Sequence, residues 1–129
     1  MPINNELKLN IEPMDTIHNE FEIILQEMKN TRNTTRFMEL FVQMIEHTKH
    51  HFKTEEDIMN AYNFYDKKEH FDEHDNLLSE MQYFYEKAQR LPMFGKSYIN
   101  EYAYDKFKRH IINIDSQLAM FLKNSNYKG

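Results

Sequence analysis

The sequence predicts an all-α protein, folded as an up-down-up-down four-helix bundle with an N-terminal extended arm. The chain has only two Gly and three Pro in 129 residues, whereas all-β chains need many such residues at their turns. Apolar residues recur at helical spacing in four long stretches. The polar breaks between these stretches are short, and short connections make consecutive helices antiparallel neighbours.

The four stretches have recognisable ends. Pro13 suits the first turn of a helix, and the segment Leu91-Pro-Met-Phe-Gly95 is the clearest turn in the sequence. Near the N-terminus, Leu7, Leu9 and Ile11 alternate with polar residues, which favours an extended segment laid across the bundle with one face buried. The expected helices span residues 13–29, 35–62, 66–90 and 96–123, and residues 1–12 form the arm.

Length and charge limit the classes of protein to consider. A chain of 129 residues is expected to form a single domain, 1–129. The net charge is −5 and basic residues are interspersed with acidic ones, so no nucleic acid partner is expected. The absence of Cys excludes disulfides and thiolate ligands and fits a cytoplasmic location. No apolar run approaches the roughly 18 residues needed to span a bilayer, so no membrane insertion is expected.

Histidines and carboxylates occur in order along the chain, one group in each expected helix. Steps of four residues place both side chains on one face of a helix, one turn apart. Together the groups supply five imidazoles and two carboxylates, enough to hold two metal ions inside a helical bundle. The candidate ligands are His18, then His51 and Glu55, then His70 and His74, and finally His110 and Asp115.

A single pair of this kind is a weak motif. With seven His and 21 acidic residues, about one His-to-acid pair at any chosen spacing arises by chance. The stronger indication is that every helix contributes and that the candidates lie on or beside the apolar stripes. Buried imidazoles and carboxylates are costly to leave unsatisfied, and metal coordination satisfies them. His47 and His50 are more simply explained as rim or solvated histidines.

The last pair departs from the four-residue step. Five residues correspond to about 500° of helical rotation, so a regular α-helix would point Asp115 some 140° away from His110. A local π-turn, which closes from residue i to i+5, brings both side chains onto one face, and such turns are frequent at functional sites. The spacing therefore predicts a π-turn near Ile111 to Asp115.

The motifs His51-x3-Glu55, His70-x3-His74 and His110-x4-Asp115, with Asp15-x-x-His18 upstream, resemble the ligand signature of the hemerythrin family. The resemblance is to the single-domain bacterial hemerythrins, and it covers roughly residues 7–121. Neighbouring residues add to it, because Phe52 follows His51 and Glu56 follows Glu55.

The resemblance implies a non-haem centre of two iron ions (Fe2+/Fe3+) with a bridging oxo or hydroxo group. Glu55 and Asp115 would bridge the ions. His70, His74 and His110 would complete one iron, and His18 and His51 would bind the other and leave one position open for dioxygen. The set of five imidazoles suits iron, although manganese, zinc and copper also bind such nitrogen and oxygen donors.

The implied function is reversible dioxygen binding for O2 storage, delivery or buffering, which is not an enzyme activity. The alternative on the same centre is an oxygen, redox or nitric-oxide responsive protein or a peroxide-consuming one, and a metal-free helical interaction module remains a further possibility. We expect the ligand pocket to have walls from Phe21, Leu25, Phe52 and Ile112. Each of these apolar residues, taken alone, is explained equally by core packing.

Overall fold

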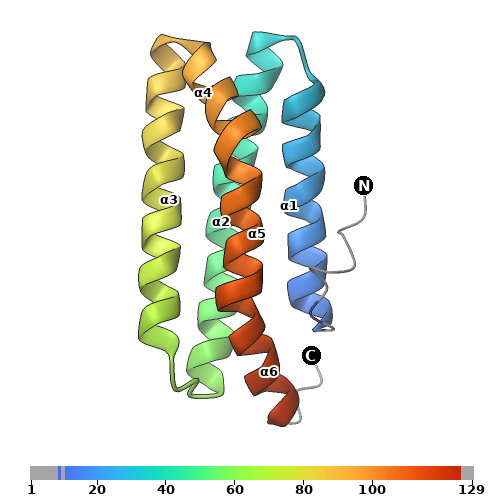
Figure 1. Cartoon of the computed structure of the whole chain (residues 1–129), viewed down its shortest axis with the longest axis vertical. Coiled ribbons are helices and arrows are strands. Elements are labelled where there is room, and N and C mark those ends of the chain that lie inside the picture. The colour runs from blue at the N-terminus through green and yellow to red at the C-terminus, as the bar shows by residue number, and fades with distance from the viewer. Residues whose placement is uncertain (1–8, 10, 126–129) are drawn as a thin grey trace.

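The described part of the protein is a helical bundle, as expected. A computed structural model describes residues 9 and 11–125, and within these ranges it contains no strand. Three long helices and a fourth, segmented one lie side by side (Figure 1). The elements are α1 (Glu12–Asn30), α2 (Thr34–Ala61), α3 (Lys67–Arg90), α4 (Pro92–Tyr98), the π-helical η2 (Ile99–Ala103), α5 (Tyr104–His110), the π-helical η3 (Ile111–Asp115) and α6 (Ser116–Asn124).

The predicted arm falls largely on residues 1–8 and 10, outside the described residues. Of its described members, Ile11 is buried and Leu9 packs against the core. The backbone N–H of Leu9 donates to Asp15 Oδ1 at 2.8 Å. This contact ties the chain before α1 to the first turn of that helix.

Local sequence explains where α2 begins and ends. Asn33 caps its first turn, because the Asn33 side chain accepts a hydrogen bond from the Arg36 N–H at 2.9 Å. After the helix, Asn63 adopts a left-handed backbone with φ of 53°, a conformation that Asn tolerates better than most residues. The N–H of Phe64 then donates back to Met59 O at 2.9 Å. The chain therefore turns sharply into α3, and Phe64 is buried.

The segment from Leu91 to Gly95 is not the turn that the sequence predicts. Helix α4 begins at Pro92, with the proline in its first turn, and Gly95 lies inside that helix. A Cβ at Gly95 would lie 2.8 Å from Ala88 Cβ and 3.1 Å from a ring carbon of Phe37. The glycine therefore serves close helix packing rather than a turn, and the fourth helical region starts four residues earlier than expected.

Two apolar clusters fill the bundle interior. One joins the later part of α1 and the earlier part of α2 to α3 and the fourth helical region, with Leu25, Phe41 and Ile111 among its members. The other contains Met14 and Leu118 and lies towards the opposite end. On α1 and α2 the candidate ligands fall between the positions that belong to these two clusters, so on these helices they form a polar layer with hydrophobic packing on both sides.

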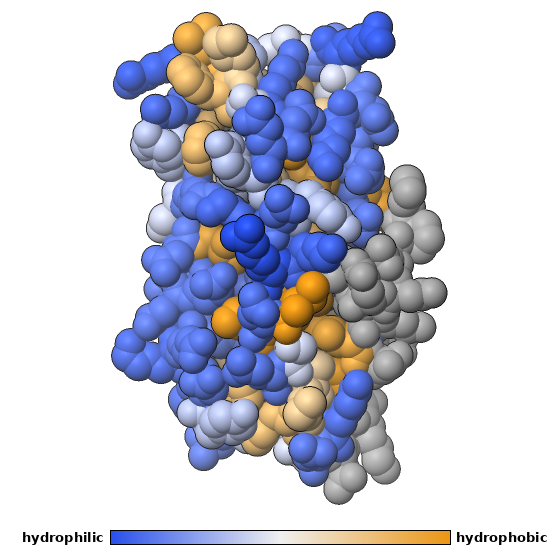
Figure 2. Space-filling view, in the orientation of Figure 1, coloured by the Kyte–Doolittle hydropathy of each residue, from blue (hydrophilic) through white to orange (hydrophobic). Residues whose placement is uncertain are grey.

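The surface is mainly hydrophilic. Figure 2 shows that charged and polar residues cover most of one face, with smaller apolar groups between them. Among the exposed apolar side chains are Met93, Ile112 and Met120. Within the described ranges, no helix combines the length and the apolar character that crossing a membrane requires.

Candidate metal centre

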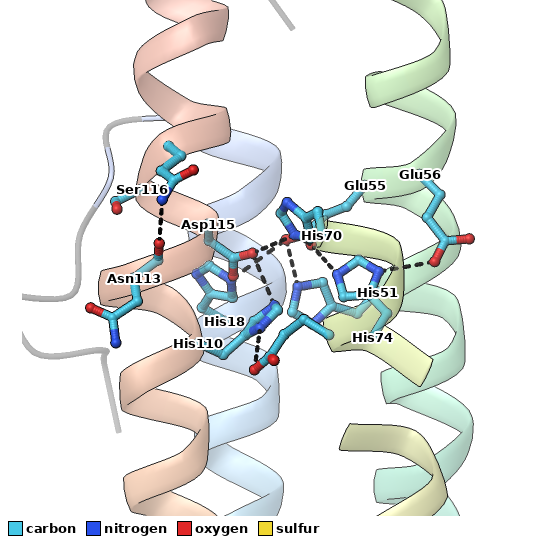
Figure 3. Close-up of polar contacts among 12 residues, drawn as sticks. His18, His51, Glu55, Glu56, His70, His74, His110, Asn113, Asp115 and Ser116 are labelled. Atoms are coloured by element: carbon cyan, nitrogen blue, oxygen red, sulfur yellow. Dashed lines mark hydrogen bonds and ion pairs between the residues drawn. The ribbon is translucent and has the colours of Figure 1, made fainter. Parts of the chain in front are cut away.

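Seven side chains from the four helical regions of the bundle meet in its interior (Figure 3). Each is at most 3% exposed, which is unusual for titratable groups unless they are paired or bind a metal. The predicted set is brought together completely: His18 from α1, His51 and Glu55 from α2, His70 and His74 from α3, His110 from α5 and Asp115 from η3.

The predicted π-turn between His110 and Asp115 is confirmed. Residues Ile111–Asp115 form η3, and the N–H of Ser116 bonds to the carbonyl oxygen of Ile111, five residues earlier. The wider turn brings the two side chains onto one face, with His110 Nε2 at 3.0 Å from Asp115 Oδ1. A second π-helical segment, η2 at Ile99–Ala103, was not expected from the sequence.

One oxygen of each carboxylate faces two members of a group of three histidines. Glu55 Oε1 lies 3.1 Å from His70 Nε2 and 3.0 Å from His74 Nε2. Asp115 Oδ1 lies 3.0 Å from the Nε2 atoms of both His70 and His110. His70, His74 and His110 therefore share one side of the cluster with these two oxygens.

The other oxygen of each carboxylate lies on the side of the remaining two histidines. Glu55 Oε2 lies 2.8 Å from His51 Nε2 and 3.8 Å from His18 Nε2, and Asp115 Oδ2 lies 2.8 Å from His18 Nε2. The cluster thus divides into a three-histidine group and a two-histidine group that share both carboxylates, and within each group the donor atoms lie within 4.8 Å of one another. Either group could hold a metal ion.

Two buried atoms support this fit. His110 Nε2 and Asp115 Oδ1 have no hydrogen-bond partner among the described residues. They lie 3.0 Å apart, but their relative orientation does not make a hydrogen bond. Buried polar atoms are rarely left in this state. A metal ion that accepts a lone pair from the imidazole nitrogen and from the carboxylate oxygen would satisfy both.

The charges within the cluster are strongly coupled. Burial favours the neutral carboxyl forms, yet the surrounding histidines hold the pKa of Glu55 and of Asp115 well below the usual values. Burial likewise opposes protonation of the imidazoles. The two carboxylates outweigh it at His18 and His70, whose pKa is raised to about 9. At His51 burial prevails, and its pKa is lowered.

A small cavity of about 30 Å³ adjoins the cluster at His51 and His110. It exceeds the roughly 10–15 Å³ that a water-sized molecule needs. Of the predicted pocket walls, Phe21 and Phe52 line it. Leu25 is fully buried in the larger apolar cluster and is not among the lining residues.

The prediction that Ile112 lines the pocket is wrong. Its side chain is 45% exposed, because two residues beyond His110 correspond to a rotation of roughly 200° and therefore to the opposite face of the helix. Ile111, by contrast, is fully buried. Several lining residues were missed because nothing in their spacing separates them from ordinary core positions: Thr48, Leu77, Met81, Tyr98, Ala103, Lys106 and Phe107.

The two histidines left out of the ligand set are also outside the cluster. His50 is exposed and His47 is half-buried. His47 Nε2 lies 3.2 Å from Glu20 Oε1, in a contact between α1 and α2 that includes none of the seven clustered side chains. Among the residues that the structure describes, neither histidine belongs to a group of donor atoms that could hold a metal.

Comparisons of the chain with models of known families, with curated proteins and with solved structures give no match. A functional assignment therefore depends on the side chains of the buried cluster and on their surroundings.

Proposed function

We propose that the chain is a hemerythrin of the single-domain bacterial kind, which binds two iron ions in the buried cluster and binds dioxygen reversibly. The ligand motifs that resemble the hemerythrin signature are the same residues that meet in the bundle interior. The proposed role is storage, delivery or buffering of O2 in the cytoplasm, without catalysis.

The observation that carries the proposal is the division of the carboxylate oxygens. Glu55 and Asp115 each direct one oxygen to the three-histidine group and the other oxygen to the two-histidine group. This is the arrangement that two bridging carboxylates require. It also makes the two positions unequal, because one has three imidazoles and the other has two.

The protein side chains would have distinct tasks around the irons. His70, His74 and His110, with the bridging carboxylates, would supply five donors to one iron, whereas His18 and His51 would leave the other with fewer protein ligands. When bound, the iron pair supplies the reversible electron transfer that dioxygen binding requires. The set contains five imidazoles and no Glu-x-x-His pair, and so differs from the carboxylate-rich ferritin-like centres.

The surroundings of the two-histidine group favour a small uncharged ligand. Phe107 contacts the His18 ring edge-on, with ring centroids 5.8 Å apart, and stacks on Phe21. These aromatic rings give the space beside His51 an apolar wall. The Thr48 hydroxyl lines the cavity but donates its hydrogen to Met44 O at 2.7 Å. It therefore has no hydrogen left to donate to a ligand. A cavity of about 30 Å³ fits a diatomic gas better than an organic substrate.

The proposal includes a finer architecture. Short connections between α1, α2, α3 and α4 support an up-down-up-down order of the helices. The contacts of Leu9 and Ile11 with the core support an N-terminal arm that packs on the bundle.

A gas-exchange experiment tests the function. The protein is loaded with Fe2+ without oxygen, and its visible spectrum is recorded through repeated cycles of air and argon. We expect an absorption band that appears in air and disappears under argon. His50→Ala, which changes an exposed histidine of α2, should cycle normally, and His18→Ala should not. Irreversible oxidation of the iron in the first cycle would contradict the proposal, and turnover of nitric oxide or peroxide would favour the alternative function.

A further inference from the structure

His74 is held by two contacts outside the cluster of ligand atoms. Its ring stacks on the Phe52 ring, with centroids 3.8 Å apart and an interplanar angle of 3°. Its Nδ1 lies 2.9 Å from Glu56 Oε2, while its Nε2 faces Glu55 Oε1 at 3.0 Å. One contact fixes the plane of the imidazole and the other fixes its rotation within that plane.

Three other histidines of the cluster lack such a partner among the described residues. The Nδ1 atoms of His18 and His70 have no hydrogen-bond partner among the described residues. His110 Nδ1 lies 3.7 Å from Glu73 Oε1, which is too long for a hydrogen bond. His74 of the three-histidine group therefore has a strong orienting contact at its Nδ1 atom, whereas the Nδ1 atom of His18 in the two-histidine group has none among the described residues.

Helix geometry explains how adjacent glutamates reach different atoms. Successive residues of α2 are rotated by about 100°, so Glu55 enters the cluster while Glu56 reaches the outer edge of the His74 ring (Figure 3). The Glu56 side chain is 29% exposed. It is therefore a carboxylate between solvent and a buried ligand, not a member of the buried donor set.

A carboxylate on Nδ1 has a defined chemical effect. It accepts the Nδ1–H of a neutral imidazole, which leaves the lone pair on Nε2 available to a metal. Loss of such a partner commonly weakens metal binding by about 10–100-fold. The partner also increases the electron density that the imidazole donates, so it strengthens the bond at Nε2.

We infer that Glu56 is a positioning residue for His74 and that it makes the three-histidine position the tighter of two unequal metal positions. An ion bound by His18, His51 and the shared carboxylates is then the first to leave. The inference rests on the two-metal centre of the proposed function, but it concerns metal retention and needs no dioxygen chemistry.

Zn2+ release tests the inference. The metal-free protein is loaded with Zn2+ and mixed with excess chromogenic chelator, and release is followed with time. We expect one ion per chain in a fast phase and one in a slow phase. Glu56→Ala should accelerate the slow phase by about 10–100-fold and leave the fast phase unchanged. Glu56→Gln, which keeps an amide oxygen as acceptor, should have a smaller effect.

A neighbouring acid provides the matched control. Asp57 is exposed and pairs with Lys53 at 2.8 Å, away from the ligands, so Asp57→Ala should release both ions as the wild type does. An equal acceleration by Asp57→Ala would overturn the inference, and so would a slow phase that neither Glu56 variant changes. A wild type that binds fewer than two Zn2+ ions would contradict the metal centre itself.

The His74 ring proton gives a readout that a general loss of stability would not move. In nitrogen-edited spectra of the Zn2+-loaded protein, the Nδ1–H of His74 should be protected from exchange. Glu56→Ala should abolish that protection, and Glu56→Gln should retain part of it. Unchanged protection in Glu56→Ala would contradict the assignment, while circular dichroism verifies that each variant keeps its helices.

Discussion

His110 and Asp115 are five residues apart, yet they face the same side of their helix, with Nε2 and Oδ1 separated by 3.0 Å. The π-helical turn η3 between them makes this possible. A π-turn of this kind corresponds to an α-helix that has gained one residue. The assembly of the cluster therefore depends on a local departure from regular helix, at a place where regular geometry would direct Asp115 elsewhere.

Removing one residue from η3 should preserve the centre. Asn113 is exposed, and its deletion would separate His110 from Asp115 by four residues, or about 400° of rotation, which keeps both on one face. We expect the deleted protein to bind two Zn2+ ions per chain and to be at least as resistant to thermal unfolding as the wild type. Zinc quantification and thermal melts measured by circular dichroism provide the test.

A deletion in regular helix serves as the control. Lys53 is also exposed and lies between His51 and Glu55, where α2 has no π-turn to absorb the change. Its removal rotates the rest of α2 by about 100°, so both zinc binding and stability should fall sharply. If the Asn113 deletion were as damaging as the Lys53 deletion, our account of η3 would be wrong.

Substitution of Gly95 should destabilise the bundle. Alanine normally favours a helix by about 1 kcal/mol over glycine, but here the new Cβ would lie 2.8 Å from Ala88 Cβ. We expect Gly95→Ala to lower the free energy of unfolding by about 1–3 kcal/mol. The loss should be smaller in an Ala88→Gly background, where the opposing methyl is absent. Urea unfolding of the four proteins in this cycle measures the coupling, and a stabilised Gly95→Ala protein would contradict the close approach.

Enlarging the cavity should weaken both packing and the exclusion of water. Met81 lines the cavity and is 5% exposed, so Met81→Ala should lower the free energy of unfolding by about 2–5 kcal/mol. We also expect faster irreversible oxidation of the iron-loaded protein in air. Met120, which is 66% exposed, provides the matched control, since Met120→Ala should change stability by less than about 0.5 kcal/mol. Equal oxidation rates in the two variants would argue against the cavity as the ligand site.

The metal-free protein should lose stability as pH rises above neutrality. The pKa of His18 and His70 is raised from 6.5 to about 9, and that of His110 to about 10, because the carboxylates outweigh burial. Their stabilising contribution is therefore complete below pH 6.5 and is lost as the pH passes through about 9 and 10. The carboxylate contributions have the opposite sign, because the pKa of Glu55 and of Asp115 is lowered, and they are lost in acid.

Urea unfolding of the metal-free protein over a range of pH measures this dependence. Stability should be highest in mildly acidic solution and should fall towards pH 10. Zn2+ should reverse the trend on the alkaline side, because imidazoles must be neutral to bind a metal. A metal-free protein that gains stability between neutral and alkaline pH would contradict the charge coupling of the cluster.

Much of the site could be predicted because helical rotation fixes which side chains share a face. The four-residue steps from His51 to Glu55 and from His70 to His74 needed only regular geometry. The five-residue step from His110 to Asp115 required a departure from regular geometry, since the two residues could share a face only if the helix widened. The structure contains that π-turn.

What the sequence did not indicate depends on packing between helices. Gly95 belongs to a segment whose proline and glycine are typical of a turn, but it lies within a helix, where it packs closely against Ala88. Phe107 has the spacing of an ordinary core residue, and its contact with His18 arises only when α1 and α5 meet. Ile112 was placed in the pocket because it lies near His110 in sequence, although helical rotation directs it to solvent. The positions of Gly95 and Phe107 depend on contacts between helices, which periodicity does not identify, whereas helical rotation alone could have excluded Ile112.

Iron binding by the wild type and by a single-ligand variant tests the central claim, that the seven side chains form two metal positions with shared carboxylates. After anaerobic loading with Fe2+ and removal of excess metal, we expect two iron ions per wild-type chain. His51→Ala removes a donor from the two-histidine group alone, so this variant should retain one iron ion per chain. One or no iron per wild-type chain, or an unchanged count in His51→Ala, would contradict the account.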